Sequence, residues 1–273
     1  MNSSGPDRSF RPVDTDALGV TPTRAEIDPT VPSTARIYDY WLGGKDNFAA
    51  DRDAAERFIE VAPHVRDLAR QNRGFMVRAA KLIAEAGVDQ FIDLGTGIPT
   101  SPNVHEVVRE TRPDARVVYV DNDPIVMAHN SALRRAPEGV ASIEADIRHP
   151  HRVLDDPQLR SLIDFDRPVG LLGVAVMHFI VEDEIVAEYV RGLAPGSHVA
   201  LSVASRVGMS EGERRRTVDS YRGTPINLRD LDQVTALFHG LELLEPGVVN
   251  MASWRAEEPE LSPVVLAGVA RVP

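Results

Sequence analysis

The 273-residue sequence predicts a mixed α/β fold built around a mostly parallel, seven-stranded sheet. From residue 90 onward, short apolar runs rich in β-branched residues alternate with segments of helical periodicity, which is typical of βαβ units. The run at 169–176 is almost wholly apolar, as expected of a central strand that helices cover on both faces. Residues 241–250 and 263–272 are two more strand-like runs without a helix between them, so we expect an antiparallel C-terminal hairpin at the sheet edge.

The N-terminal third has a different character. Residues 1–28 are polar and interrupted by prolines, which predicts a disordered tail. Residues 29–87 predict a helical cap or lid, clearest at 66–86, where apolar side chains recur at steps of three, four or seven. Gly87 is expected just past the end of that helix. Residues 88–273 then predict the domain that contains the sheet.

Within that domain, strand and helix segments alternate as the fold requires. The expected strands are 91–94, 116–120, 141–145, 169–176 and 198–204, and the expected helices are 103–111, 124–135, 182–193 and 229–238. This order places successive strand ends at one edge of a parallel sheet, where open α/β sheets bind their ligands.

Composition narrows the classes of function. The chain has 30 basic and 41 acidic residues, a formal net charge of −11, and no cysteine. The lack of cysteine excludes disulfides and thiolate metal sites, and the histidines show no metal-ligand spacing. An acidic chain is not expected to bind nucleic acid or an anionic membrane. No apolar run reaches the ~18 residues of a membrane span, and no signal peptide is recognisable, so we expect a cytoplasmic protein.

A glycine motif follows the first expected strand. Residues 93–97 read Asp-Leu-Gly-Thr-Gly, and two glycines two apart allow a tight turn and a close approach of the backbone to a ligand. A dinucleotide fingerprint would need a third glycine where Thr100 stands, which counts against a nicotinamide cofactor. We expect Ser101 to be the N-cap and Pro102 the first residue of the next helix. The alternative interpretation is a plain strand-to-helix turn.

Acidic residues follow the next two strands. Asp121 ends the second strand, where nucleotide sites hold ribose hydroxyls. Asp123 precedes Pro124 and is expected to cap the helix, which leaves Asp121 free for the ribose. Asp146, after the third strand, is placed to accept a hydrogen bond from an exocyclic amine such as adenine N6. These side chains are expected to face one crevice.

Five segments together resemble a family of S-adenosylmethionine-dependent methyltransferases that is common in actinobacteria and belongs to class I. The segments are 36–47, 72–75, 93–100, 119–124 and 145–148, and the resemblance runs from about residue 28 to the C-terminus. It implies a Rossmann-like class I fold, S-adenosyl-L-methionine as cofactor, S-adenosyl-L-homocysteine as product, and a small-molecule methyl acceptor that it does not identify.

The resemblance also implies a set of cofactor-binding residues. They are Tyr38, Asn72, Arg73, Asp93, Gly95, Thr96, Gly97, Asp121, Asn122, Asp146, Ile147, Val174 and Met177. By position, Asp93 would orient the glycine loop and meet the methionine ammonium, and Asp121 would take the ribose hydroxyls with Asn122 beside the adenine. Asp146 would take adenine N6, and the Ile147 amide a ring nitrogen.

Two features of the cap have alternative interpretations. Tyr38, Tyr40 and Trp41 either form a lid whose rings attract the sulfonium or pack the accessory helices onto the domain. The two tyrosines cannot both share a helix face with Trp41, so at least one points elsewhere. Asn72 lies on an apolar stripe and needs a partner, either a neighbouring loop or, with Arg73, the cofactor carboxylate.

The segment after the fourth strand supplies the candidate catalytic residue. His178 is the best-placed general base, or else a histidine satisfied beside the cofactor, and Met177 is expected to pack against the adenine.

The run 214–216, near Tyr221 and Arg222, is either a solvated helix face or a site for an acidic acceptor. Three functions follow: a methyltransferase, a non-catalytic S-adenosylmethionine-binding sensor or partner subunit, and, least favoured, a nicotinamide oxidoreductase.

Overall fold

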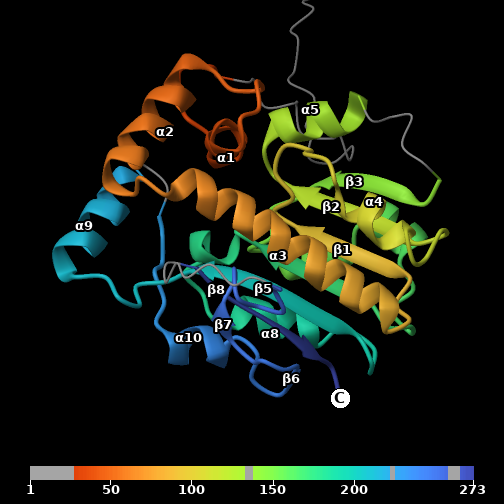
Figure 1. Cartoon of the computed structure of the whole chain (residues 1–273). Helices are drawn as coiled ribbons and strands as arrows, with labels where there is room; N and C mark the ends of the chain where they lie inside the picture. The colour runs from red at the N-terminus through yellow and green to blue at the C-terminus, as the bar shows by residue number, and fades with distance from the viewer. Residues whose placement is uncertain (1–27, 133–137, 222–224, 258–264) are drawn as a thin grey trace, which may run out of the picture.

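The computed structural model describes residues 28–132, 138–221, 225–257 and 265–273. Within these residues the strands form one mixed sheet in the order β3-β2-β1-β4-β5-β8-β6, with β7 also paired to β8 (Figure 1). The strands are β1 (Gln90–Leu94), β2 (Arg116–Asp121), β3 (Val140–Glu144), β4 (Gly170–Val174), β5 (His198–Ala204), β6 (Glu242–Leu243), β7 (Val249–Asn250) and β8 (Val265–Arg271). Strands β1 to β5 are parallel, as the alternating sequence pattern predicts.

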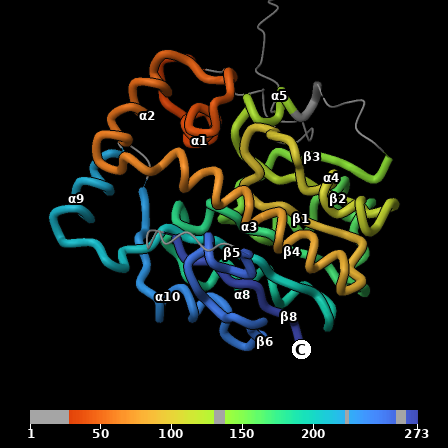
Figure 2. The backbone as a smooth tube through the Cα atoms, viewed as in Figure 1, coloured from red at the N-terminus to blue at the C-terminus, as the bar shows by residue number. Residues whose placement is uncertain are grey.

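Helices cover both faces of this sheet (Figures 1 and 2). The helices of the described residues are α1 (Thr34–Leu42), α2 (Ala49–Val61), α3 (Val65–Glu85), α4 (Val104–Arg109), α5 (Pro124–Ala132), α6 (Pro150–Leu154), α7 (Pro157–Leu162), α8 (Glu184–Val190), α9 (Glu211–Ser220) and α10 (Leu231–Ala236). Apolar residues of α3 and α4 form one core with the sheet, and those of α6, α7, α8 and α10 form the other. The predicted α/β class is therefore confirmed, but the described sheet has eight strands where seven were predicted.

The strand register brings the chemically active residues to one edge. In the parallel ladder, Leu94 is paired with Val120, and Asp121 with Glu144. The strands β1, β2 and β3 therefore end at nearly the same level, and the loops that follow them lie side by side. This alignment is what gathers the predicted site residues.

The C-terminal strands are antiparallel, as predicted, but there are three of them and they do not form a single hairpin. Strand β8 pairs with β5 over its full length, and both β6 and β7 then pair with β8. The predicted run 241–250 is split into β6 and β7 because Pro246 has no amide hydrogen and Gly247 has a φ of 84° in the intervening turn. The run thus occupies the predicted edge as two short strands.

The helices α1 and α2 form a cap, and the turn between them is held by the buried Asp39 side chain. Asp39 accepts hydrogen bonds from the Asp46 backbone N at 3.0 Å and from Asn47 Nδ2 at 2.9 Å. A Cβ atom at Gly44 would collide with the Asp39 carboxylate, so this position requires glycine. The conspicuous Gly-Gly-Lys-Asp-Asn segment is therefore a structural turn between the two cap helices.

A buried ion pair joins the same two helices. Arg36 Nε on α1 lies 2.8 Å from Asp51 Oδ2 on α2, and both side chains are buried. The sequence predicts α3 as part of the cap. In the structure α3 contacts α1 but also packs along β4, β5 and β8. Helix α3 ends where the sequence predicts, just before Gly87, whose φ is 103°.

One predicted helix start is wrong. Helix α4 begins at Val104 with Asn103 as its N-cap, not at Pro102 with Ser101. The Glu106 side chain accepts from the Asn103 backbone N, and this capping box fixes the start two residues later.

Four sequence predictions fall partly outside the described ranges. The residues concerned are 1–27 of the predicted tail, 133–135 of the helix predicted at 124–135, Arg222 of the possible acceptor site, and 263–264 of the strand predicted at 263–272. Among the described helices, none is long and apolar enough to cross a membrane.

Candidate active site

A cavity of about 1090 Å³ opens where the strand ends meet the cap. One part, the strand-end half, is lined by the segments that follow β1, β2, β3 and β4. The other part, the cap half, lies among α1, α2, α3, α9, the one-turn helix Met177–Phe179 and the loop after β5. Of the predicted site residues, the cavity lining includes Tyr38, Asn72, Arg73, Asp93, Gly95, Thr96, Gly97, Asp121, Asn122, Asp146, Ile147, Val174 and His178.

Asp93 is a buried carboxylate at the end of β1. Burial raises its pKa from 3.8 to about 6, and the nearby Asp121 carboxylate acts in the same direction. A hydrogen bond from Thr96 and the Arg73 guanidinium act in the opposite direction, but they do not offset the burial. A carboxylate in this state gains from a bound cation, because the cation favours its charged form.

The glycine loop wraps tightly over the end of the sheet. Both Gly95 and Gly97 have positive φ angles, 64° and 67°. A Cβ atom at Gly95 would collide with Val176, which follows β4, so the two loops touch at that point. A Cβ atom at Gly97 would meet no atom within 4 Å, so Gly97 borders open space in the cavity.

Asp123 caps helix α5, as predicted, and Asp121 has other partners. Asp123 Oδ1 accepts from the Ile125 backbone N at 2.8 Å, and its other oxygen accepts from Ser33 Oγ at the start of the cap. Asp121 accepts from the backbone N atoms of Gly97 at 2.8 Å and Asp123 at 2.9 Å. Burial raises the pKa of Asp121, and these two hydrogen bonds partly counter it.

Asp146 lies beyond β3 with its charge already paired. The guanidinium of Arg148 binds both of its oxygens, with Nη2 at 2.6 Å from Oδ2 and Nε at 3.0 Å from Oδ1. This hydrogen bond holds the pKa of Asp146 below its ordinary value. The adjacent Ile147 carbonyl accepts from Tyr189 Oη at 3.0 Å, which fixes the backbone of this loop.

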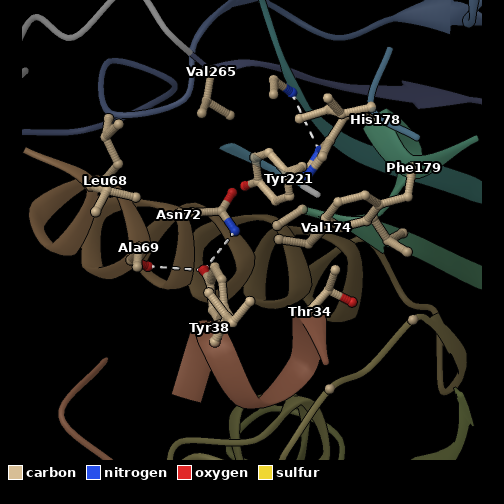
Figure 3. Close-up of a pocket in the computed structure, with 18 of the residues that line it drawn as sticks. Thr34, Tyr38, Leu68, Ala69, Asn72, Val174, His178, Phe179, Tyr221 and Val265 are labelled. Carbon is tan, nitrogen blue, oxygen red and sulfur yellow. Dashed lines mark hydrogen bonds between the residues drawn. The ribbon is translucent and has the colours of Figure 1, made fainter. Parts of the chain in front are cut away.

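Asn72 is the centre of a hydrogen-bond chain beside the cavity, and Figure 3 shows the part that runs through Tyr38 to Ala69. Its Nδ2 donates to Tyr38 Oη at 3.1 Å, and its Oδ1 accepts from Ser202 Oγ at 2.6 Å. Tyr38 in turn donates to the Ala69 carbonyl at 3.1 Å. The chain ties α1 to α3 and β5, so the polar group on the apolar stripe has the partners that its burial requires.

Arg73, Trp41 and Tyr40 each have a defined partner. The Arg73 guanidinium binds the carbonyls of Thr100 and Pro102 and so closes the loop that follows the glycine motif. Trp41 is buried against Phe58, whereas Tyr40 binds Glu56 on the exposed side. One tyrosine therefore points away from Trp41, as predicted.

His178 is buried in the one-turn helix that follows β4. Burial lowers its pKa from 6.5 to about 3, and the positive charge of Arg229 acts in the same direction. Its Nδ1 lies 3.5 Å from the Ala204 backbone N. Its neighbour Met177 does not line the cavity: the side chain is buried in the core beneath the sheet. The predicted packing of Met177 against the adenine is therefore wrong.

Sequence reasoning missed several residues that build the site. Arg229 is 1% exposed and binds the carbonyls of Met177 and Ile180 at 2.9 Å, which holds His178 in place. Ser202 is a buried polar residue within the apolar stretch 199–204 of β5, and that mismatch is a signal in the sequence. The rings of Phe58, Phe179 and Tyr221 reach the cavity from separate elements and carry no common motif.

Comparison with known proteins then gives the family. The S-adenosyl methyltransferase family matches residues 20–273 of this sequence. The chain belongs to the S-adenosyl methyltransferase family. It is accordingly an enzyme that uses S-adenosylmethionine to methylate an acceptor, as the sequence motifs predicted. A comparison with the curated proteins finds no match.

Two solved structures are similar over nearly their whole length. A proposed methyltransferase from Thermobifida fusca YX is 38% identical, with a TM-score of 0.84 over 89% of this chain and 96% of that chain. A DUF574 family protein from Streptomyces avermitilis is also 38% identical, with a TM-score of 0.86 over 91% of this chain and 100% of that chain.

The strand-end half has the chemistry that this methyltransferase cofactor requires. S-Adenosylmethionine carries a sulfonium and an ammonium but no phosphate, and this half presents the buried carboxylates of Asp93 and Asp121. The Arg and Lys side chains that line the described cavity are Arg73 and Arg148, and both are already engaged. A phosphate-bearing nucleotide would find no free cation among them.

The raised pKa of Asp93 predicts how this methyltransferase responds to pH. An ionised Asp93 attracts the cationic cofactor, so affinity for S-adenosylmethionine should fall about tenfold from pH 7 to pH 5 as the group is protonated through a pKa of about 6. Calorimetric titrations at several pH values measure this. The folding stability of the ligand-free protein depends on pH in the opposite direction. Because the charge of buried Asp93 is unfavourable, this stability falls as pH rises from 3.8 towards 6.

Asp93→Asn provides the control for that titration. The variant keeps the size of the side chain but cannot ionise, so its affinity should be low and nearly independent of pH over the same range. If the variant retained the wild-type pH dependence, another group would be responsible for it.

Proposed function

We propose that this enzyme transfers the methyl group of S-adenosylmethionine to a small-molecule acceptor bound in the cap half of the cavity. The observation that carries the proposal is the pair of buried carboxylates, Asp93 and Asp121, at adjoining strand ends in a cavity whose lining arginines are engaged. When bound, S-adenosylmethionine supplies an electrophilic methyl group, whose transfer to an acceptor lone pair breaks the C–S bond and leaves the electron pair on sulfur.

The residues of the strand-end half have distinct roles in this proposal. Asp93 would hold the ammonium, and Asp121 would accept hydrogen bonds from the ribose hydroxyls. Asp146 and the Ile147 amide would meet the adenine, with Asn122 beside it and Arg148 sharing the Asp146 carboxylate. Gly97 leaves the open space that the cofactor needs.

Orientation, not proton transfer, is the main contribution we infer for the protein. Positioning of two reactants can supply roughly 7–11 kcal/mol of the barrier, and the Asn72 chain and the Arg73 clamp keep the cavity walls in place. His178 faces the same cavity but has a pKa of about 3, far below the value that suits a general base near neutral pH. We therefore propose that neutral His178 orients the acceptor by hydrogen bonding.

Calorimetric titration with S-adenosylmethionine and S-adenosylhomocysteine tests the cofactor assignment, with NAD and ATP as controls. Both sulfur compounds should bind and neither control should. Incubation with S-adenosylmethionine and a pool of small molecules then tests turnover, read as S-adenosylhomocysteine formed above the acceptor-free rate. Binding without turnover would favour the non-catalytic alternative, and no binding of either sulfur compound would contradict the proposed function.

A further inference from the structure

The cavity has room for a second molecule beside the cofactor. Its volume of about 1090 Å³ is slightly above the range, roughly 300–1,000 Å³, that is usual for pockets that bind one drug-sized ligand. The strand-end half accounts for the cofactor, so the cap half is the space left for the acceptor. What lines the cap half therefore selects the acceptor.

Four aromatic rings form a continuous surface in the cap half, which we call the aromatic wall. The centroid of Trp41 lies 4.9 Å from that of Phe58, Phe58 lies 4.9 Å from Tyr221, and Tyr221 lies 5.7 Å from Phe179. These rings come from α1, α2, the end of α9 and the one-turn helix after β4. Figure 3 shows Tyr221 between Asn72 and His178, with Phe179 next to His178.

Aliphatic side chains extend this surface. The cavity lining also contains Ile37, Val61, Val65, Leu68, Val207, Met209, Ile226, Leu228 and Val265. Rings and aliphatic groups of this kind bind an apolar body by removing its surface from water, and aromatic faces add attraction for a cation of roughly 0.5–2 kcal/mol.

The charges around the cavity are nearly all negative. Seven carboxylates line it: Asp67, Asp93, Asp121, Asp123, Asp146, Glu182 and Glu213, of which Asp67 is paired with Arg70 and Asp146 with Arg148. Over the described ranges, the opposing guanidiniums are Arg73 and Arg148, already bound to backbone carbonyls and to Asp146. The arginines 214–216 are exposed and absent from the lining, so the described part of α9 gives no support to an acidic acceptor.

On the basis of the proposed function, we propose that the acceptor is a hydrophobic, ring-bearing small molecule without negative charge, of the arylalkylamine class, bound against the aromatic wall. The apolar body would lie on the four rings, and a neutral or cationic amine suits a cavity rich in carboxylates. An aryl carboxylate of the same size would meet repulsion from those groups and no free guanidinium among the described residues that line the cavity.

The two tryptophans of the chain allow a direct binding test. Trp41 belongs to the aromatic wall, whereas Trp254 is fully buried against Phe75 in the other core. In a Trp254→Phe variant, the fluorescence of Trp41 alone reports on the cap half. The probes are 4-phenylbutylamine and 4-phenylbutyrate, which share ring and chain but differ in charge, titrated with and without saturating S-adenosylhomocysteine.

We expect a saturable change in Trp41 fluorescence with the amine, at a Kd at least tenfold below that of the carboxylate. Equal or tighter binding of the carboxylate would overturn the proposal, and so would the absence of saturation with both probes. Failure of S-adenosylhomocysteine itself to bind in calorimetry would contradict the proposed function, whereas the probe comparison without it still tests the aromatic wall.

Single-ring variants locate the binding surface. Phe179→Leu and Tyr221→Leu, on separate elements, should each weaken 4-phenylbutylamine binding at least fivefold and leave S-adenosylhomocysteine binding unchanged. Phe165→Leu is the matched control, because its ring packs beneath Arg160 and does not line the cavity. Equal amine affinity in all three variants would place the probe elsewhere and overturn the proposal.

Discussion

Replacing Asp121 by alanine is expected to weaken binding of S-adenosylmethionine and S-adenosylhomocysteine at least a hundredfold in a protein that remains folded. The carboxylate holds the backbone N of Gly97 at 2.8 Å and would also accept the ribose hydroxyls. Each charge-assisted hydrogen bond is worth roughly 1.5–3 kcal/mol, so the loss of two corresponds to about 3 kcal/mol, or roughly a hundredfold in affinity.

Stability should change much less than affinity in this variant. Burial raises the pKa of Asp121, which means that its charge is unfavourable in the empty protein and that its removal relieves this cost. Calorimetry gives the affinity, and thermal unfolding followed by circular dichroism gives the stability. A cofactor affinity within fivefold of the wild type would show that Asp121 does not hold the ribose.

Asp123→Asn is the matched control two residues away. An asparagine still caps α5 by accepting from the Ile125 amide, so this variant should fold and bind the cofactor within about threefold of the wild type. The pair of variants separates a ligand-binding carboxylate from a helix-capping one, although both lie at the same strand end.

The parts of the site that could be predicted from sequence are those set by local spacing. Asp93, Gly95 and Gly97 lie within five consecutive residues at the end of β1 and in the loop after it, and any parallel sheet brings that segment to the ligand-binding edge. The same geometry applies to Asp121, the last residue of β2. These residues do line the cavity, because strand register alone fixes where they lie.

The parts that escaped prediction depend on long-range packing. The aromatic wall joins Trp41 to Tyr221, residues 180 positions apart, through contacts among α1, α2 and α9 that leave no periodic pattern. Asn72 was correctly expected to need a partner, but its actual partners, Tyr38 and Ser202, follow from how α3 lies on the sheet. Met177 was misplaced because a one-turn helix after β4 directs it into the core.

Arg229 is the second residue for which we expect a large effect. Its guanidinium is 1% exposed and donates to the carbonyls of Met177 and Ile180 and to Asp183 Oδ1, at 2.7–2.9 Å. Substitution by methionine keeps an unbranched chain as far as the position of the arginine Nε but removes every donor. Buried carbonyls without partners cost roughly 1–3 kcal/mol each, so the free energy of unfolding should fall by about 3 kcal/mol or more.

Arg206→Met is the control, because Arg206 pairs with Asp230 in the same region but both side chains are more than a third exposed. An exposed ion pair is worth ~0–1 kcal/mol, so chemical denaturation should reveal a loss about threefold smaller than for Arg229→Met. Losses of similar size in the two variants would mean that burial of the Arg229 network contributes little.

The same substitution should change the titration of His178. Burial is the larger cause of its low pKa and the charge of Arg229 the second, so in Arg229→Met the pKa should rise above 3 but stay below 6.5. A histidine kept neutral in the fold costs stability as pH falls below 6.5, since only the unfolded chain then gains the proton. The variant should therefore lose stability less steeply with acid, and NMR of the imidazole ring would follow the pKa directly. An unchanged pKa beside a large loss of stability would assign Arg229 to holding the backbone alone, and would leave burial as the sole cause of the weak basicity of His178.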